Sequence, residues 1–307
     1  MREPRVAVFG GCNLDISGRC LSRQHLYDSN PGIVTMTPGG VGRNIAANIA
    51  SAGVETTLVT ALGDDDKKEM ILASAPACLS FDDAFVFRGE STGSYLAVLD
   101  DRGELYTAVN DMRIIDRLTA EKLASRRALA ERCRYTVVDA NLSAEALAEI
   151  FSWSIRAVVD GVSAVKVEKF KAFIDRINVL KCNILEARAL SGLGENARLI
   201  DCGADLLRKG AERVVITAGA DGAYVFSKSE TIHFKTSAME IQGATGAGDA
   251  FVGMLTAELV EGKNFIDATI GAMAASRLVL KSDDSDLRGF HREAWEREKQ
   301  EVDYDII

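Results

Sequence analysis

The segment RVAVFGGCNLDISGRCLSRQHLYDSNPGIVTMTPGGVGRNIAANIASAGVETTLVTAL, residues 5–62, decides the fold class of this chain. Its first part, Arg5–Gly11, is an apolar run that ends in two glycines, a pattern that predicts a buried strand. Gly42–Gly53 has apolar residues at helical spacing and a glycine at its end, which predicts a helix. Val54–Leu62 is apolar again and predicts another strand. This strand–helix–strand order indicates an α/β fold.

The same alternation continues along the chain. Short β-branched runs predict further strands at Tyr135–Ala140, Arg156–Asp160, Asn178–Lys181 and Arg213–Thr217. The strands lack polar alternation, which is typical of strands buried on both faces, so we predict a mostly parallel sheet between two helix layers. Beyond Gly246 the sequence predicts helices at Ala247–Val260 and Phe265–Leu280, and from Asp283 a solvated helix with a frayed end.

Two segments, 12–37 and 91–113, interrupt this alternation with polar sequence that is compatible with strands. The second segment predicts a hairpin in which Ser94–Leu99 and Glu104–Val109 flank a turn. Together the two segments are compatible with a small antiparallel sheet beside the main one, or with two ordinary surface loops.

Composition and charge exclude several classes of protein. Of the 307 residues, 47% are hydrophobic and 26% charged, a balance that excludes a disordered or collagen-like chain. We find no apolar run of the ~18 residues that span a bilayer and no signal peptide, so we expect neither membrane insertion nor export. The net charge is −9 without a basic stripe, so we expect no nucleic-acid partner. The six cysteines form no C-x-x-C pair, which disfavours a zinc site and fits a cytoplasmic location.

The strongest chemical signal is Gly243-Ala244-Thr245-Gly246-Ala247-Gly248-Asp249, directly before a predicted helix. Glycines bring backbone N–H groups close to a ligand, and the start of a helix favours an anion such as phosphate. A carboxylate repels phosphate, so its presence makes sense if Asp249 takes a proton from a hydroxyl that then attacks phosphorus. On local sequence alone, a simple helix cap explains Asp249 equally well.

Three further motifs are weaker. The run Pro38-Gly39-Gly40-Val41-Gly42-Arg43-Asn44 offers close backbone approach to a small hydroxylated ligand, or is only a glycine-rich turn into a helix. Asn183 and Glu186 follow a strand and share a helix face, where they suit the water shell of Mg²⁺, although such pairs are common by chance. Thr217–Gly222 follows another strand and either supports a nucleotide or turns the chain. The P-loop, G-x-G-x-x-G and protein-kinase motifs are absent, which disfavours those classes.

In this order, the motifs resemble the ribokinase-like (PfkB) carbohydrate kinase family over nearly the whole chain. Gly39–Gly53 looks like its N-terminal signature, Gly246–Asp249 like its C-terminal signature, and Asn183-x-x-Glu186 like its magnesium-associated motif. The resemblance implies a three-layer αβα sandwich with a mostly parallel central sheet and a small β lid. The core is then expected at 1–12, 38–90 and 114–307, and the lid at 13–37 and 91–113.

The resemblance implies an ATP-dependent phosphotransferase that uses Mg²⁺ and phosphorylates the 5′-hydroxyl of a nucleoside. Within the family, the lid segments are most similar to those of members that phosphorylate pseudouridine, so pseudouridine is the favoured substrate. The similar stretches, which lie largely in the lid segments, are Asp28–Gly32, Thr37–Ala46, Ser94–Leu96, Leu99–Asp100, Gly103–Glu104, Asn110–Met112, and Val162–Ala164 followed by Lys166. Another nucleoside or a sugar such as ribose is the alternative substrate. A catalytically silent nucleotide- or sugar-sensing protein on the same fold is the alternative class.

The resemblance also implies roles for individual residues. Asp249 is expected to be the general base, next to the phosphoryl-stabilising loop of Gly246, Ala247 and Gly248. The expected substrate-binding residues are Asn13, Asp15, Gly39, Gly40, Arg43, Asn44, Ser94, Asn110, Asp111, Met112 and Lys166. The expected nucleotide-binding residues are Asn183, Thr217, Gly219, Asp221 and Gly222, and Asn183 and Glu186 are expected to hold Mg²⁺ through water.

The sequence departs from the family pattern at a few positions. Gly243 and Ala244 stand where many members have Asp-Thr, so binding of a monovalent cation stays open. Cys182 and Gly161 stand where prolines are expected. The resemblance further implies a homodimer through the lid, because an exposed sheet has edges and a face to cover.

Overall fold

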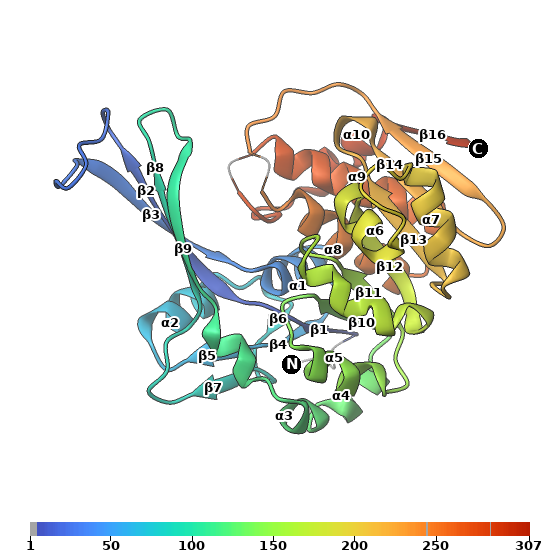
Figure 1. Cartoon of the computed structure of the whole chain (residues 1–307), viewed down its shortest axis with the longest axis horizontal. Helices are drawn as coiled ribbons and strands as arrows, with labels where there is room; N and C mark the ends of the chain where they lie inside the picture. Colours follow the sequence, from blue (N-terminus) through green and yellow to red (C-terminus); the bar gives the residue numbers. More distant parts are fainter. Residues whose placement is uncertain (1–4, 244, 283) are drawn as a thin grey trace.

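The structure is a computed structural model that describes residues 5–243, 245–282 and 284–307. A layered core carries a second sheet that projects from one side (Figure 1). The α-helices are α1 (Val41–Ser51), α2 (Asp66–Ala73), α3 (Ala120–Ala124), α4 (Arg127–Arg132), α5 (Ala144–Phe151), α6 (Ile184–Ser191), α7 (Leu199–Arg208), α8 (Ala247–Val260), α9 (Phe265–Leu280) and α10 (Arg292–Lys299). Short 3₁₀ helices are η1 (Arg113–Arg117), η2 (Lys166–Ala172), η3 (Ile174–Arg176) and η4 (Gly219–Asp221).

The core is built on one large sheet. Its strands are β1 (Val6–Phe9), β4 (Thr56–Val59), β6 (Leu79–Ser80), β10 (Tyr135–Asp139), β11 (Ala157–Asp160), β12 (Ile177–Asn183), β13 (Arg213–Thr217), β14 (Ala223–Phe226), β15 (Thr231–Thr236) and β16 (Val302–Ile306). Within the described residues they form ten strands in the order β16-β15-β14-β13-β12-β11-β10-β1-β4-β6. All neighbours from β6 to β13 are parallel, whereas β14, β15 and β16 add an antiparallel edge.

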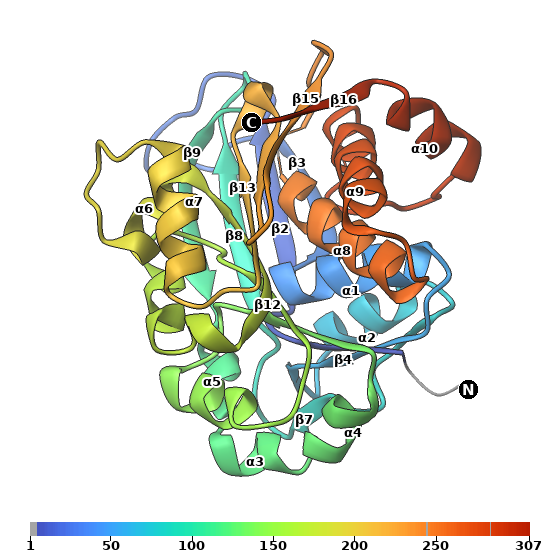
Figure 2. The same ribbon diagram turned by 90° about the vertical axis from the view of Figure 1, so that its right-hand side faces the viewer.

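Alternation along the strands buries both faces of this sheet. In β1, Val6 and Val8 point into the apolar cluster formed with α1, α8 and α9, while Phe9 points into the cluster formed with α5, α6 and α7. Figure 2 shows α6 and α7 on one side of the sheet and α8 and α9 on the other. The predicted three-layer α/β fold with a mostly parallel sheet is therefore confirmed, and its strands are continuous apolar runs because both faces are covered.

Two smaller sheets flank the core. The projecting sheet has the order β3-β2-β8-β9, made of β2 (Asn13–Cys20), β3 (Gly32–Gly39), β8 (Ser94–Leu99) and β9 (Leu105–Asp111). The alternative of two surface loops is wrong, since both segments form strands. The pairs β2–β3 and β8–β9 are antiparallel, but β2–β8 is parallel, so the predicted antiparallel sheet is in fact mixed. A parallel β5 (Ala61–Gly63) and β7 (Phe85–Phe87) form the third sheet.

The C-terminal segment differs from the prediction of a solvated helix with a frayed end. Helix α10 is anchored by Trp295, which is 3% exposed and donates a hydrogen bond of 2.8 Å to the Gly271 oxygen. The chain then forms β16, which pairs antiparallel with β15. Apolar and acidic residues alternate strictly in Val302–Ile306, and this period of two is the strand signal that the charge of the segment concealed. Asp283, where the predicted helix began, lies outside the described residues.

The predicted strand at Val54–Leu62 is also wrong in one respect. The chain forms β4, leaves the large sheet after Val59 and continues as β5 in another sheet. Both strands are apolar, so hydrophobicity alone does not reveal the change of sheet. Among the described residues, none of the helices is long and apolar enough to cross a bilayer.

Candidate active site

The first turn of α8 forms the centre of the candidate site. Gly246 precedes the helix with a φ of 86°, a left-handed conformation that favours glycine. A Cβ at this position would overlap the carbonyl oxygen of Ser285, so a larger residue does not fit. The N–H groups of Ala247, Gly248 and Asp249 precede the first hydrogen bond of the helix. They are therefore available to an anion, which the positive end of the helix dipole also favours.

Asp249 joins this turn to the glycine cluster at the start of α1. Its Oδ2 atom accepts a hydrogen bond of 2.9 Å from Nδ2 of Asn44. The residue at the N-cap position of α8 is Gly246, and Asp249 is the third residue of the helix. The helix-cap alternative is therefore wrong, because the carboxylate lies inside the first turn and contacts a side chain of another helix.

The surroundings of Asp249 make it a stronger proton acceptor than an ordinary aspartate. Burial and the charge of Asp160 raise the pKa of Asp249 to about 8, although the hydrogen bond from Asn44 and the charge of Lys181 act in the opposite direction. A base works best when its pKa lies near the working pH. The carboxylate is thus tuned towards proton transfer at neutral pH.

A lysine lies against the same turn. The Nζ atom of Lys181 donates a hydrogen bond of 3.0 Å to Oδ2 of Asp160, and both side chains are buried. A Cβ placed on Gly248 would be 2.7 Å from this Nζ atom, so the ammonium group lies directly beside the helix start. Burial lowers the pKa of Lys181, but Asp160 and Glu186 outweigh it and hold the pKa above its usual range. A fixed positive charge therefore stands where an anion would bind.

Asn183 and Glu186 form a capping box at the start of α6. Oδ1 of Asn183 accepts the Glu186 N–H at 3.0 Å, and Oε2 of Glu186 accepts the Asn183 N–H at 2.9 Å. Glu186 is 3% exposed, and burial raises its pKa although Lys181 opposes the shift. Carboxylate and amide oxygens keep further lone pairs, so the pair also fits metal-bound water. Within the described residues, we find no group of three or more His, Cys, Asp or Glu arranged to hold a metal directly.

Several residues expected to bind substrate converge near Asn44. Nδ2 of Asn13 donates a hydrogen bond of 2.6 Å to Oδ1 of Asp15, and Gly39 packs directly against the Asp15 carboxylate. Gly40 has a φ of 96°, and a Cβ there would lie 2.9 Å from Oδ1 of Asn13. Burial raises the pKa of Asp15, while the Asn13 hydrogen bond opposes the shift. These groups form a compact polar cluster at the base of β2.

Arg43 does not face a ligand pocket. Its side chain is 1% exposed and forms an ion pair with Asp286, which is 3% exposed. It also donates hydrogen bonds to Oδ1 of Asn44 at 3.3 Å and to Oγ of Ser74 at 3.2 Å. A direct contact with substrate needs an accessible guanidinium group, so the structure contradicts the prediction of such a contact for Arg43.

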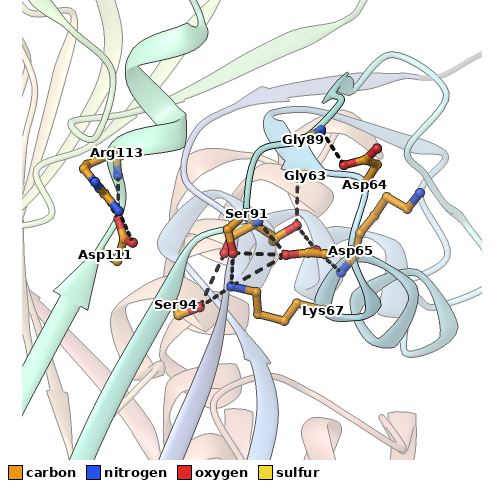
Figure 3. A network of polar contacts seen from close by, with 11 residues as sticks. Gly63, Asp64, Asp65, Lys67, Gly89, Ser91, Ser94, Asp111 and Arg113 are labelled. Carbon is orange, nitrogen blue, oxygen red and sulfur yellow. Dashed lines mark hydrogen bonds and ion pairs between the residues drawn. The ribbon is translucent and has the colours of Figure 1, made fainter.

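Three of the remaining substrate candidates lie in the projecting sheet, on two different faces. In the strand register, Asn110 pairs with Tyr95 and Tyr95 with Asp15, so Asn110 lies on the face of Asp15. Asp111 pairs with Ser94 and lies on the opposite face. Figure 3 shows the Asp111 carboxylate held by Arg113, which lowers the pKa of Asp111 to about 2.

The other two candidates, Met112 and Lys166, lie near the segment 11–13 that follows β1. Gly93 packs against Sδ of Met112 and close to Cβ of Asn13, which places Met112 beside the polar cluster. Nζ of Lys166 donates a hydrogen bond of 2.6 Å to Oδ1 of Asn141, and Nδ2 of Asn141 lies close to Gly11. Both side chains thus border the carboxyl end of β1.

The loop after β13 lies beside the start of α6. Thr217 pairs in register with Asn183, and its Oγ1 donates a hydrogen bond of 3.4 Å to the Cys182 oxygen. Gly219 and Gly222 bracket η4. Asp221 accepts a hydrogen bond of 2.8 Å from Oη of Tyr224, so this carboxylate has a local partner. The structure thus brings the residues expected to bind a nucleotide to one end of the sheet.

Sequence reasoning missed a row of charged residues beneath the site. Asp139, Asp160 and Lys181 are aligned in register on the neighbouring strands β10, β11 and β12. Burial raises the pKa of Asp139, and the charge of Asp160 adds to this shift. The available signal was a charged residue at or near the carboxyl end of each of three apolar runs, where α/β sheets bind ligands.

Comparison with known proteins matches the chain to one family of enzymes. The model of the pfkB family carbohydrate kinases matches residues 3–287. Pseudouridine kinase of Escherichia coli (strain K12) is 36% identical over 290 residues, which cover 91% of this chain and 92% of that protein.

Two solved structures resemble the fold. A carbohydrate kinase from Agrobacterium tumefaciens is 26% identical, with a TM-score of 0.88 and coverage of 99% of this chain and 100% of that one. The ribokinase of Arabidopsis thaliana, complexed with ribose and ATP, is 18% identical with a TM-score of 0.83, and covers 97% of this chain and 99% of its own. With the family match over most of the sequence, the chain belongs to the pfkB family of carbohydrate kinases and is a phosphotransferase with an alcohol group as acceptor.

Proposed function

We propose that this kinase transfers the terminal phosphoryl group of ATP to the 5′-hydroxyl of a nucleoside, with pseudouridine as the preferred substrate. The observation that carries the proposal is the carboxylate of Asp249 in the first turn of α8, bonded to Asn44 and beside the buried ammonium of Lys181. The start of a helix binds a phosphate in this way. A carboxylate in the same turn accepts the proton of a hydroxyl that attacks the phosphorus.

Each group then has one task. Asp249 accepts the proton of the attacking hydroxyl as the oxygen approaches phosphorus. The N–H groups of Ala247, Gly248 and Asp249 donate to the oxygens of the migrating phosphoryl group, and Lys181 adds positive charge beside them. Asn44 holds the base in place. Catalysis thus rests on positioning and electrostatics.

We assign ATP and Mg²⁺ to the part of the site that is formed by the loop after β13 and the start of α6. Thr217, Gly219, Asp221 and Gly222 form the loop that we assign to the nucleotide, next to Asn183 and Glu186. These two residues would hold Mg²⁺ through its water ligands, as their spare oxygen lone pairs allow. When bound with ATP, the ion supplies positive charge that neutralises the phosphates.

We assign the acceptor to the polar cluster at the base of β2. The Asp15 carboxylate accepts hydrogen bonds from two ribose hydroxyls, while Asn13 fixes its orientation. The projecting sheet then acts as a lid, and Asn110 contacts the base from the face of Asp15. Pseudouridine is preferred on the 36% identity with the pseudouridine kinase, and another nucleoside or ribose is the alternative.

The test is ADP release with ATP·Mg²⁺ and a panel of pseudouridine, uridine, adenosine, guanosine, inosine, ribose and fructose. We expect pseudouridine to give the highest kcat/KM, and Asp249→Asn to lose at least ~10²-fold in kcat. Asp205→Asn on α7 is the matched control, because Asp205 pairs with its helix neighbours Arg208 and Lys209 and is none of the residues assigned to the site. Unchanged turnover in Asp249→Asn contradicts the base assignment, and a better acceptor in the panel contradicts the substrate.

We also propose that two copies associate through the lid. Apolar side chains exposed on this sheet include Ile33, Val34, Met36, Leu96, Leu105, Tyr106 and Val109. An exposed apolar sheet of this kind favours association. Light scattering at micromolar concentration is expected to give the mass of a dimer, and replacement of Met36 and Val109 by Lys is expected to give a monomer.

A further inference from the structure

Arg43 and Asp286 form a buried ion pair between distant parts of the chain. Arg43 lies in the first turn of α1, and Asp286 lies in the segment after α9, 243 residues later. Their side chains are 1% and 3% exposed. A charged pair removed from water in this way tolerates little movement, because the loss of either partner leaves a buried charge without compensation.

The segment that carries Asp286 is fastened on both sides of this pair. Nε of Arg288 donates a hydrogen bond of 3.0 Å to Oδ1 of Asp286. The N–H of Leu287 donates one of 2.8 Å to Oδ1 of Asn48, one turn further along α1. The carbonyl of Ser285 packs against Gly246 at the start of α8. The Asp286 carboxylate is thus a fixed support for the guanidinium group of Arg43.

Arg43 also contacts the amide group that holds Asp249, the proposed base. Its Nη1 atom donates to Oδ1 of Asn44 at 3.3 Å, and Nδ2 of the same amide donates to Oδ2 of Asp249 at 2.9 Å. An amide has a donor end and an acceptor end, whereas a guanidinium group has only donors. Arg43 therefore holds the acceptor end of Asn44 towards itself and the donor end towards Asp249.

We propose that Arg43, supported by Asp286, is a positioning residue that orients the Asn44 amide and thereby the carboxylate of Asp249. Its effect on turnover rests on the proposed role of Asp249 as the base, but its effect on the carboxylate itself does not. A rotated Asn44 would present its carbonyl oxygen to Asp249, and two acceptors would then face each other. Arg43 thus acts on the reaction without touching a substrate.

Burial is the largest cause of the raised pKa of Asp249, and three other charged groups also act on it. Asp160 on β11 and Asp139 on β10 raise the pKa of Asp249, and Lys181 on β12 lowers it. The Asn44 hydrogen bond also lowers this pKa. Loss of the oriented amide is therefore expected to raise the pKa of Asp249 by about one unit, since hydrogen bonds to charged groups are strong.

The experiment follows the Asp249 carboxyl carbon by NMR titration of protein labelled with ¹³C-aspartate, with Asp249→Asn for assignment. The double variant Arg43→Met with Asp286→Leu removes both charges together, so that no buried ion is left alone. We expect its Asp249 pKa to rise by about one unit. In ADP release with pseudouridine and ATP·Mg²⁺, we expect kcat at pH 7 to fall about tenfold, because the ionised fraction falls by that factor.

Two further variants separate orientation from stability. Arg277→Met removes another buried arginine, which pairs with Glu298 on α10, and is expected to lower the melting temperature without moving the Asp249 pKa. Arg43→Lys retains the charge and is expected to shift the pKa less than the double variant does. A double variant that folds and keeps the wild-type pKa of Asp249 overturns the proposal. If the pKa shifts but Asp249→Asn still turns over, the orientation stands and the proposed base is wrong.

Discussion

At the scale of single residues, the site is a balance of buried charges. Asp249, Asp160 and Glu186 surround one cation, Lys181, at the carboxyl end of the central strands. Because Asp249 is shielded from water and carboxylates outnumber the lysine, the proton on Asp249 is held more tightly than in an ordinary aspartate.

The first prediction concerns the stability of the ligand-free protein. In the unfolded chain Asp249 ionises near its usual pKa of 3.8, whereas in the folded protein it keeps its proton up to about pH 8. The folded state binds more protons between these values, so this residue makes the protein less stable as pH rises. Asp249→Asn removes that effect and is expected to melt on the order of 10 °C higher at pH 8. Thermal denaturation at pH 4 is the internal control, where the two melting temperatures should coincide.

The second prediction concerns Lys181. Replacement of Lys181 alone leaves Asp160 buried without its partner, so the informative variant is Lys181→Met combined with Asp160→Asn. Loss of the ammonium group beside α8 is expected to lower kcat about 10²-fold, with a smaller change in the KM of ATP. Steady-state kinetics measure this split. Lys209→Met on α7, which removes a lysine paired with Asp205, should leave both constants unchanged.

At the scale of elements, the start of α8 depends on a turn that another segment fastens. Gly246 has a φ of 86° and lies directly against the carbonyl of Ser285. The turn thus requires glycine for two reasons, its backbone conformation and the lack of space for a side chain. The N–H groups of Ala247, Gly248 and Asp249 point toward the expected anion only while Gly246 keeps this conformation.

The third prediction separates these two reasons. Gly262 also has a φ of 86°, but a Cβ there would come no closer than 3.9 Å to Nη2 of Arg134. Gly262→Ala is therefore expected to cost about 1–2 kcal/mol of folding free energy from backbone strain alone, with normal kcat. Gly246→Ala is expected to cost more and to lower kcat at least tenfold, because the first turn of α8 has to move. Urea denaturation and ADP release measure the two effects, and equal behaviour of the variants would show that the contact with Ser285 is unimportant.

At the scale of the whole molecule, a polar network joins the projecting sheet to the core (Figure 3). Asp65, the N-cap of α2, accepts hydrogen bonds from the N–H of Thr92 at 2.9 Å and from its Oγ1 at 2.6 Å. Nζ of Lys67 donates to Oγ of Ser91 at 2.7 Å and to Oγ of Ser94 at 2.8 Å. These contacts with the start of α2 therefore fix the position of the segment 91–94, which leads into β8.

The fourth prediction tests this connection. Lys67→Met removes the bonds to Ser91 and Ser94, so the sheet is held less firmly over the acceptor. The KM of the acceptor is expected to rise about three- to tenfold, with a smaller change in kcat. Lys68→Met is the matched control, since Lys68 on the same helix pairs with its neighbour Glu69. A rise of equal size in both variants would contradict a specific role for Lys67.

Much of the fold could be predicted because it depends on local patterns. Helices α8 and α9 begin and end where the sequence predicted, and β13 does as well. The C-terminal β16 differs from the prediction because the high charge of the segment conceals its period of two. The change of sheet between β4 and β5 was missed because both strands are equally apolar.

The glycine-rich turn before a helix and the place of Asp249 near the start of that helix can be predicted from the sequence, because both follow from neighbouring residues. The packing of the folded chain brings Asp249 into contact with Asn44, 205 residues away, and turns Arg43 inward to Asp286. It also places Lys181 beside Gly248. Such contacts depend on how separate strands and helices pack, and a single sequence carries no local signal for the partner of a buried charge.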